Sequence, residues 1–327
     1  MENFRYARAT SLGSALTALR DPSTRALAGG TELLNWMRDG IDAPRQVVDI
    51  GGLPLDGFEA TDRGLRIGAL ARMSDVGAHP VVRRDYLVLS QSLELAASPQ
   101  IRNLGTMGGN LMQRTRCAYF RSETPVPCNK RAAGTGCAAR HGENRLHAIF
   151  GWSDACVATH PSDLAVALAA LDAVVHLAST AGERTVHAAE LHRLPDDDPQ
   201  HDTVLHPGEL IVAVEVPAAA STLHSYYLKV RERTSYEFAM VSAAVTLDLD
   251  GRTIREARVA LGGVAHRPWR LPDAERALRG VPLEHGAMTT AIGGAFGDAR
   301  PLEQNGFKVR LAKNAVVRAL EHAGGLP

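Results

Sequence analysis

The sequence has little of several features that mark common classes of protein. No apolar segment approaches the ~20 residues that a helix needs to cross a membrane, so no membrane span is expected. The chain has 36 acidic and 36 basic residues, so it lacks the basic excess typical of proteins that bind nucleic acid. Its N-terminus carries charges throughout and no apolar core, so we expect no signal peptide of its own.

Cysteine is also scarce, and all four cysteines fall within one stretch, residues 98–163. They are Cys117, Cys128, Cys137 and Cys156, separated by 10, 8 and 18 residues. This spacing lacks the close pairs typical of zinc ribbons. A chain of 327 residues can also build a core without disulfides. The spacing leaves three interpretations open: an iron–sulfur cluster, a zinc site or unligated thiols.

The residues around the cysteines favour the cluster among these interpretations. Prolines and glycines prevent regular structure there and let the backbone wrap a bulky inorganic group. Between residues 98 and 145 there are eight Arg or Lys residues and two Glu residues. A cluster held by four thiolates is anionic, and nearby cations would stabilise it. His141, His147 and His160 could be alternative ligands, but with four cysteines available we expect them beside the ligands or on the surface.

Two glycine-rich loops are the second notable feature. One spans residues 28–32, after a short apolar strand and before a helical pattern, and the other spans residues 105–110. Such loops let backbone N–H groups approach a phosphate closely, and a following helix N-terminus favours an anion. Two loops could hold the two phosphates of one dinucleotide, although either loop alone could be an ordinary turn. Neither is G-x-G-x-x-G, so a Rossmann site for NAD is not supported.

These residues carry a resemblance to a known family. The strings Ala28–Leu33 and Arg102–Leu111 resemble the first and second FAD loops of the FAD-binding subunits of molybdenum hydroxylases, the xanthine dehydrogenase and carbon monoxide dehydrogenase family. The resemblance extends over essentially the whole chain. The cysteine stretch is absent from most members and resembles the periplasmic aldehyde oxidoreductase branch, whose FAD subunit carries an additional [4Fe–4S] cluster. This resemblance favours the cluster strongly over the other two interpretations.

The resemblance also implies a set of site residues. Asp163 would contact the FAD ribose or lie nearby, Lys229 would face the flavin ring, and Ile211 could pack on it, although a core position is the simpler interpretation of Ile211. The predicted FAD-binding residues are Ala28, Gly29, Gly30, Thr31, Glu32, Leu33, Gly105, Thr106, Gly108, Gly109, Asn110, Asp163, Ile211 and Lys229. The predicted ligands of the [4Fe–4S] cluster are Cys117, Cys128, Cys137 and Cys156. No residue of the chain is expected to be catalytic, because the flavin would supply the redox chemistry.

The predicted fold class is α+β. The resemblance implies a two-subdomain FAD-binding fold of the vanillyl-alcohol-oxidase (PCMH) type, followed by a C-terminal α+β domain with an antiparallel sheet, of the CO dehydrogenase flavoprotein type. We place the domains at residues 1–55, 56–220 and 221–327, with the cluster insertion at about 114–157. Local patterns predict a longer helix within Val81–Ala97 that ends before Pro99, a helix beginning at Ser162, and Thr31 as a possible helix cap.

The expected function is that of an electron-transfer subunit of a molybdenum-dependent aldehyde oxidoreductase. By resemblance, its FAD receives electrons from a molybdenum-cofactor subunit through a [2Fe–2S] subunit, in a heterotrimer, and passes them to an external acceptor. By the same resemblance, a periplasmic location would require export with a signal-bearing partner; otherwise the complex would be cytoplasmic. The alternatives are a free-standing flavin oxidase, for which no acid or base over the flavin can be identified, and a zinc-stabilised scaffold protein.

Overall fold

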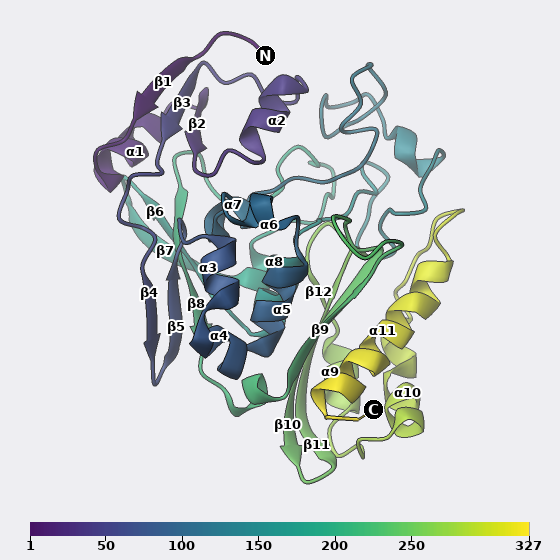
Figure 1. The fold of residues 1–327 in the computed structure, drawn as a ribbon. Helices are drawn as coiled ribbons and strands as arrows, with labels where there is room; N and C mark the ends of the chain where they lie inside the picture. Colours follow the sequence, from purple (N-terminus) through teal and green to yellow (C-terminus); the bar gives the residue numbers. More distant parts are fainter. Residues whose placement is uncertain (327) are drawn as a thin grey trace.

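The chain forms three units, each built around its own β-sheet (Figure 1). The computed structural model describes residues 1–326; Pro327, the last residue of the predicted third domain, lies outside the described residues. The sheets have the strand orders β1-β3-β2, β4-β5-β8-β6-β7 and β12-β11-β10-β9. The predicted α+β class with antiparallel sheets is confirmed. Within the described part of the chain, no helix combines the length and apolar character needed to cross a bilayer.

The N-terminal unit is a small parallel sheet with two helices. Its elements are β1 (Arg5–Arg8), α1 (Leu12–Leu19), β2 (Thr24–Leu27), α2 (Leu33–Arg38) and β3 (Gln46–Asp49). Ser11 starts α1 with a capping box, in which its hydroxyl accepts from the backbone of Ser14 and the hydroxyl of Ser14 accepts in return. The first glycine loop connects β2 directly to α2, and this connection brings the loop to one end of the sheet.

The middle unit packs helices on a five-stranded antiparallel sheet. Its elements are β4 (Phe58–Thr61), β5 (Gly64–Gly68), α3 (Met73–Ala78), α4 (Pro80–Asp85), α5 (Leu87–Leu95), α6 (Pro99–Arg102), α7 (Met107–Leu111), α8 (Asp163–Ala170), β6 (Val174–Ser179), β7 (Gly182–His187) and β8 (Leu210–Pro217). Every residue of α8 is buried, because this helix packs against α5 on one side and against β10 and β11 of the third unit on another. The helix begins where predicted, since the hydroxyl of Ser162 accepts from the amide of Ala165.

The longer helix predicted within Val81–Ala97 is α5, which ends before Pro99, and a separate short helix, α4, precedes it. The backbone leaves the helical region at Tyr86, with φ −135° and ψ 53°, and this break separates α4 from α5. The N-terminus of α4 has its own cap, because the ring of His79 accepts from the amide of Val81. The apolar periodicity continues across the break, so the pattern alone did not predict it.

The C-terminal unit is a four-stranded antiparallel sheet covered by helices. Its elements are β9 (Ser225–Val230), β10 (Val241–Asp250), β11 (Thr253–Gly262), β12 (Trp269–Arg270), α9 (Pro272–Ala277), α10 (His285–Ile292) and α11 (Phe307–Ala323). Gly251, at φ +58°, makes the tight turn between β10 and β11, a conformation that favours glycine. The long helix α11 packs on β9 and β10 and buries its apolar face there.

The cysteine stretch lies between α7 and α8 and is almost free of regular structure. Over residues 112–162 its one helical element is a short 3₁₀ turn at Ala138–Arg140. It runs beside the N-terminal unit and the start of α11 (Figure 1). Irregular structure was predicted here from the prolines and glycines. We call residues 112–162 the cysteine segment.

Candidate functional site: a dinucleotide cleft beside a four-cysteine cavity

A cleft of about 880 Å³ lies among the three units, a volume suited to a cofactor. Both glycine loops line it, together with the start of α8 and the loop between β9 and β10. Thirteen of the fourteen predicted FAD-binding residues are among its lining residues: Ala28, Gly29, Gly30, Thr31, Glu32, Leu33, Gly105, Thr106, Gly108, Gly109, Asn110, Asp163 and Ile211. The structure thus brings together two loops separated by more than 70 residues of sequence.

The two glycine loops touch each other where they meet the cleft. A Cβ atom on Gly29 would lie 2.0 Å from the carbonyl oxygen of Leu104, so only glycine allows this approach. The next residue, Gly30, has φ +74°, in the left-handed region that side chains disfavour. The first loop therefore needs glycine at both positions, for two different physical reasons.

The second loop continues into α7, a helix that the sequence patterns did not predict. The hydroxyl of Thr106 caps α7 by accepting from the amide of Gly109 at 3.1 Å. The hydroxyl of Ser162 donates to the side-chain oxygen of Asn110 at 2.5 Å, so the loop is tied to the start of α8. The possible cap at Thr31 is not formed, because the N-cap position of α2 is Glu32, which makes no side-chain cap hydrogen bond.

Asp163 lines the cleft, whereas Lys229 lies next to Asp163, and its placement at the flavin ring stays a prediction. Lys229 does not line the cleft; its ammonium donates to Asp163 at 2.8 Å and to the carbonyl of Leu95 at 3.0 Å. The hydroxyl of Tyr227 donates to the other oxygen of Asp163 at 2.6 Å. Burial raises the pKa of Asp163, and the charge of Lys229 and both hydrogen bonds oppose that rise. Lys229 therefore influences the charge that the cleft presents indirectly, through its ion pair with Asp163.

Several residues that line the cleft were missed by the sequence analysis. Arg116 comes from the cysteine segment, and Arg233, Tyr236 and Phe238 come from the loop between β9 and β10. The guanidinium of Arg116 lies 4.8 Å from the ring centroid of Phe238, so the two segments meet at the cleft. These residues belong to irregular loops without a motif, so no local pattern marked them.

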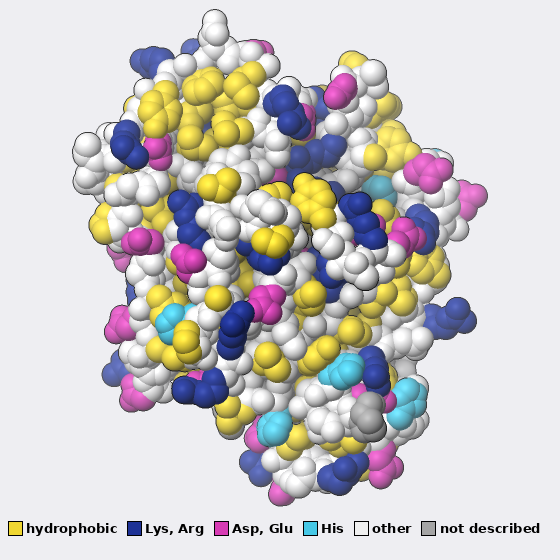
Figure 2. Space-filling view, viewed as in Figure 1, with side chains coloured by type: hydrophobic (Ala, Val, Ile, Leu, Met, Phe, Trp, Pro, Cys, Tyr) yellow, Lys and Arg dark blue, Asp and Glu magenta, His cyan; other side chains and the backbone are white. Residues whose placement is uncertain are grey.

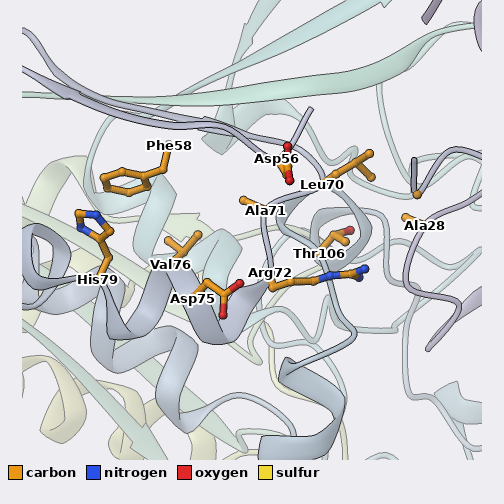
Figure 3. Close-up of a pocket in the computed structure, with 11 residues that line it drawn as sticks. Ala28, Asp56, Phe58, Leu70, Ala71, Arg72, Asp75, Val76, His79 and Thr106 are labelled. Carbon is orange, nitrogen blue, oxygen red and sulfur yellow. The ribbon is translucent and has the colours of Figure 1, made fainter. Parts of the chain in front are cut away.

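A second cavity of about 170 Å³ adjoins the glycine loops and shares Ala28, Leu70 and Thr106 with the cleft (Figure 3). Arg72 is one of its charged lining residues, and its guanidinium donates to the carbonyl of Leu104. That is the same carbonyl that a side chain at Gly29 would meet. Arg72 therefore braces the second glycine loop at its contact with the first.

The four cysteines line a third, small cavity of about 10 Å³, roughly the volume that one water occupies. All four are free thiols. Cys128 and Cys137 face each other across a short antiparallel bridge, and the thiols of Cys137 and Cys156 are hydrogen-bonded. Cys117 approaches from the start of the cysteine segment. The structure therefore brings together residues that span 39 positions of irregular sequence.

The thiols differ in acidity because their surroundings differ. Burial raises the pKa of Cys117 to about 11. The hydrogen bond from Cys156 lowers the pKa of Cys137 to about 6 and raises that of Cys156. The hydrogen bond between the two thiols therefore favours the thiolate form of Cys137 over that of Cys156.

The described residues include no group of three or more His, Cys, Asp or Glu side chains placed to hold one metal ion. A zinc ion needs its ligands about 2.3 Å from one point, and the cysteines are not arranged in this way. A [4Fe–4S] cluster makes a different demand, because each cysteine binds its own iron at a corner of the cluster. Four thiols placed around one cavity match that ligand set, but the cavity would have to widen to hold the cluster.

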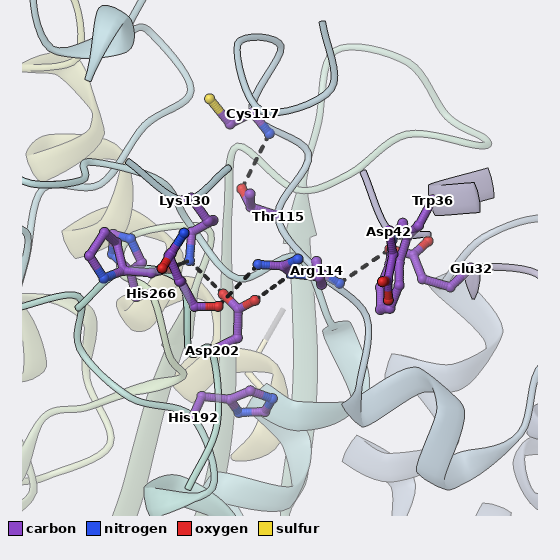
Figure 4. A network of polar contacts seen from close by, with 12 residues as sticks. Glu32, Trp36, Asp42, Arg114, Thr115, Cys117, Lys130, His192, Asp202 and His266 are labelled. Atoms are coloured by element: carbon purple, nitrogen blue, oxygen red, sulfur yellow. Dashed lines mark hydrogen bonds and ion pairs between the residues drawn. The ribbon is translucent and has the colours of Figure 1, made fainter. Parts of the chain in front are cut away.

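Charged side chains fasten the cysteine segment to both sides of the cleft, and Figure 4 shows the contacts of Asp202 with Lys130 and Arg114. On one side, the carboxylate of Glu32 accepts from Arg116 and Arg121, both at 2.7 Å. On the other side, Asp202 accepts from Lys130 at 2.5 Å and from Arg114 at 2.6 Å. Glu32 lines the cleft, but its carboxylate is directed to these cations of the segment.

The cleft and its loops define a protein that binds a dinucleotide cofactor between three α+β units. The family model described as "FAD binding domain in molybdopterin dehydrogenase" matches residues 2–219, and the model "CO dehydrogenase flavoprotein C-terminal domain" matches residues 226–323. The chain belongs to the family of FAD-binding subunits of molybdenum hydroxylases and is an oxidoreductase subunit. FAD as its cofactor, predicted from the loops and the resemblance, is confirmed.

Individual relatives agree with this membership. The chain is 47% identical to the "Aldehyde oxidoreductase FAD-binding subunit PaoB" of Escherichia coli K12, over 99% of each chain. It is 27% identical to the "Glyceraldehyde dehydrogenase medium chain" of Sulfolobus acidocaldarius, over 86% of this chain and 82% of that one. Among solved structures, carbon monoxide dehydrogenase from Hydrogenophaga pseudoflava matches with a TM-score of 0.76 at 26% identity, covering 99% of this chain and 98% of that one.

Proposed function

We propose that this chain is the FAD- and [4Fe–4S]-binding electron-transfer subunit of a molybdenum-dependent aldehyde oxidoreductase. The observation that carries the proposal is the pairing of the cleft with a separate four-cysteine cavity in one chain. The identity of 47% with a relative named as an aldehyde oxidoreductase FAD-binding subunit supports the substrate class. When bound, FAD would supply the redox chemistry, receiving electrons from the partner subunits and passing them to an external acceptor.

The chain's own residues would hold and orient the FAD. Gly29, Gly30 and Gly105 line the cleft, where backbone N–H groups of such glycine loops would hold a pyrophosphate. Asp163, held by Tyr227 and Lys229, presents a fixed polar group to the cleft. Apolar side chains from the loop between β9 and β10 would cover the bound cofactor and exclude water.

Cys117, Cys128, Cys137 and Cys156 would hold the [4Fe–4S] cluster. Their common cavity supports this assignment, as do the basic residues of the surrounding segment, which would stabilise an anionic cluster. Each of the four thiolates would bind one iron of the cluster.

The proposed partners are a [2Fe–2S] subunit and a molybdenum-cofactor subunit, in a heterotrimer. With its four cysteines assigned to one cluster, this chain has none left for a [2Fe–2S] centre. Acidic and basic side chains are interspersed on the face drawn in Figure 2, which suits docking to protein surfaces of mixed polarity. The two partners would supply the redox centres that this chain lacks.

The test compares the purified single chain with the complex obtained by co-expression with candidate partner subunits. We expect flavin absorbance together with a broad iron–sulfur absorbance, about four irons and four sulfides per chain on the stoichiometry of the cluster, and aldehyde oxidation by the complex alone. Aldehyde turnover by the single chain would instead indicate a free-standing flavin oxidase. Stoichiometric zinc without iron would refute the cluster.

A further inference from the structure

Two buried histidines lie against two of the four cysteines. The Nε2 atom of His147 is 3.2 Å from the sulfur of Cys117, and the Nε2 atom of His266 is 3.2 Å from the sulfur of Cys156. The two histidine residues are 7% and 8% exposed, so water does not compete freely for these contacts. The other two cysteines have no such imidazole contact among the described residues.

The two histidines come from different units and are held independently. His147 lies within the cysteine segment, where the carbonyl of its own backbone accepts from the buried ammonium of Lys308 at 2.9 Å. His266 follows β11, and the backbone before it is bonded to the segment, because Val264 accepts from the amides of Ile149 and Phe150. Both rings are therefore placed by surrounding backbone contacts.

The second nitrogen of each ring shows which atom carries the proton. The Nδ1 atoms of His147 and His266 are buried and have no hydrogen-bond partner. A proton on Nδ1 would leave a buried donor without an acceptor, and this is less tolerable than a buried lone pair without a donor. The proton therefore resides on Nε2, and each Nε2–H points at a sulfur.

We propose that His147 and His266 donate N–H···S hydrogen bonds to the cluster ligands Cys117 and Cys156 and thereby raise the reduction potential of the [4Fe–4S] cluster. This inference rests on the proposed function of the four cysteines. Reduction adds negative charge to the cluster, and a hydrogen bond to a ligating sulfur stabilises the more negative state. The histidines act through the cysteines, so they are positioning residues rather than ligands.

The test replaces each histidine by leucine, His147→Leu and His266→Leu, in the co-expressed complex purified without oxygen. Iron and sulfide analysis shows whether the cluster is present, and a redox titration followed by electron paramagnetic resonance gives its midpoint potential. We expect full cluster and FAD content, and an equilibrium constant for cluster reduction about tenfold lower, which is about 59 mV for one electron. A merely structural role would not change this potential.

The matched control is His192→Leu. His192 is also buried, and its Nε2 atom contacts the carbonyl of Leu111 at 2.8 Å and no cysteine. We expect an unchanged midpoint potential in this variant. A full cluster with an unchanged midpoint in both His147→Leu and His266→Leu would overturn the inference and leave the proposed function intact. A wild-type complex without iron would refute the proposed function itself.

A second pair of variants covers the case in which a leucine variant loses its cluster. His147→Gln and His266→Gln keep a side-chain N–H that can donate to sulfur. A cluster regained in these variants with a midpoint near that of the wild type supports the hydrogen bond. A cluster that is still lost, or one with a midpoint shifted as far as in the corresponding leucine variant, contradicts it.

Discussion

Gly29→Ala tests the contact between the two glycine loops most directly. The added Cβ would lie 2.0 Å from the carbonyl oxygen of Leu104 and 2.8 Å from its carbon, and both atoms belong to the backbone. Ordinary contact begins near 3.4 Å, so the loops must separate by more than 1 Å. Overpacking of this kind costs about 1–3 kcal/mol, and the upper end is expected where no side chain can turn away.

The separation acts on the cleft because both loops line it. If about 3 kcal/mol opposes the cofactor-bound arrangement, the affinity for FAD falls on the order of 100-fold. The assay measures flavin released by acid per protein chain after gel filtration, with circular dichroism to verify folding. Gly13→Ala is the control, because its Cβ would meet nothing closer than 4.0 Å. Full flavin content in a folded Gly29→Ala variant would refute the loop contact as a determinant of the site.

Three further outcomes follow from the site. Cys128→Ser should remove most of the iron, measured per FAD by metal analysis, while the flavin stays; iron equal to the wild type would contradict the ligand assignment. Asp202→Asn should destabilise the chain by about 3 kcal/mol in denaturant unfolding, because it leaves the buried Lys130 without its carboxylate. Lys130 and Arg114 hold the pKa of Asp202 below its usual value despite burial, so this contribution is present above about pH 4 and is lost as the pH falls further. Asp163→Asn should raise the flavin midpoint potential in a redox titration, because the charge of Lys229 is left uncompensated beside the cleft; an unchanged or lower midpoint would contradict this.

Local signals in the sequence predicted the features that depend on neighbouring residues. The glycines of both loops marked turns before the structure showed why they are required, and Ser162 marked the start of α8. The irregular structure of the cysteine segment was also predicted, from its prolines and glycines. Each of these features can be predicted without knowing which distant segments of the chain contact one another.

Contacts between residues far apart in the sequence could not be predicted from local patterns. Lys229 was expected at the flavin, but it lies behind Asp163, because a pairing over 66 positions decides where its ammonium points. Glu32 was expected to serve the cofactor, yet its carboxylate binds arginines more than 80 positions away. In both cases the partner of the charged group could not be inferred from spacing.

The cysteine segment holds the molecule together at the point where the three units meet. Glu32 of the first glycine loop binds its Arg121, Asp202 of the middle unit binds its Lys130, and Lys308 of α11 binds the carbonyl of its His147. Glu32 is at once a lining residue of the cleft and an anchor of the segment. The cysteine segment is therefore joined by direct charge contacts to the loop that lines the cleft, even though the two sites share no ligand.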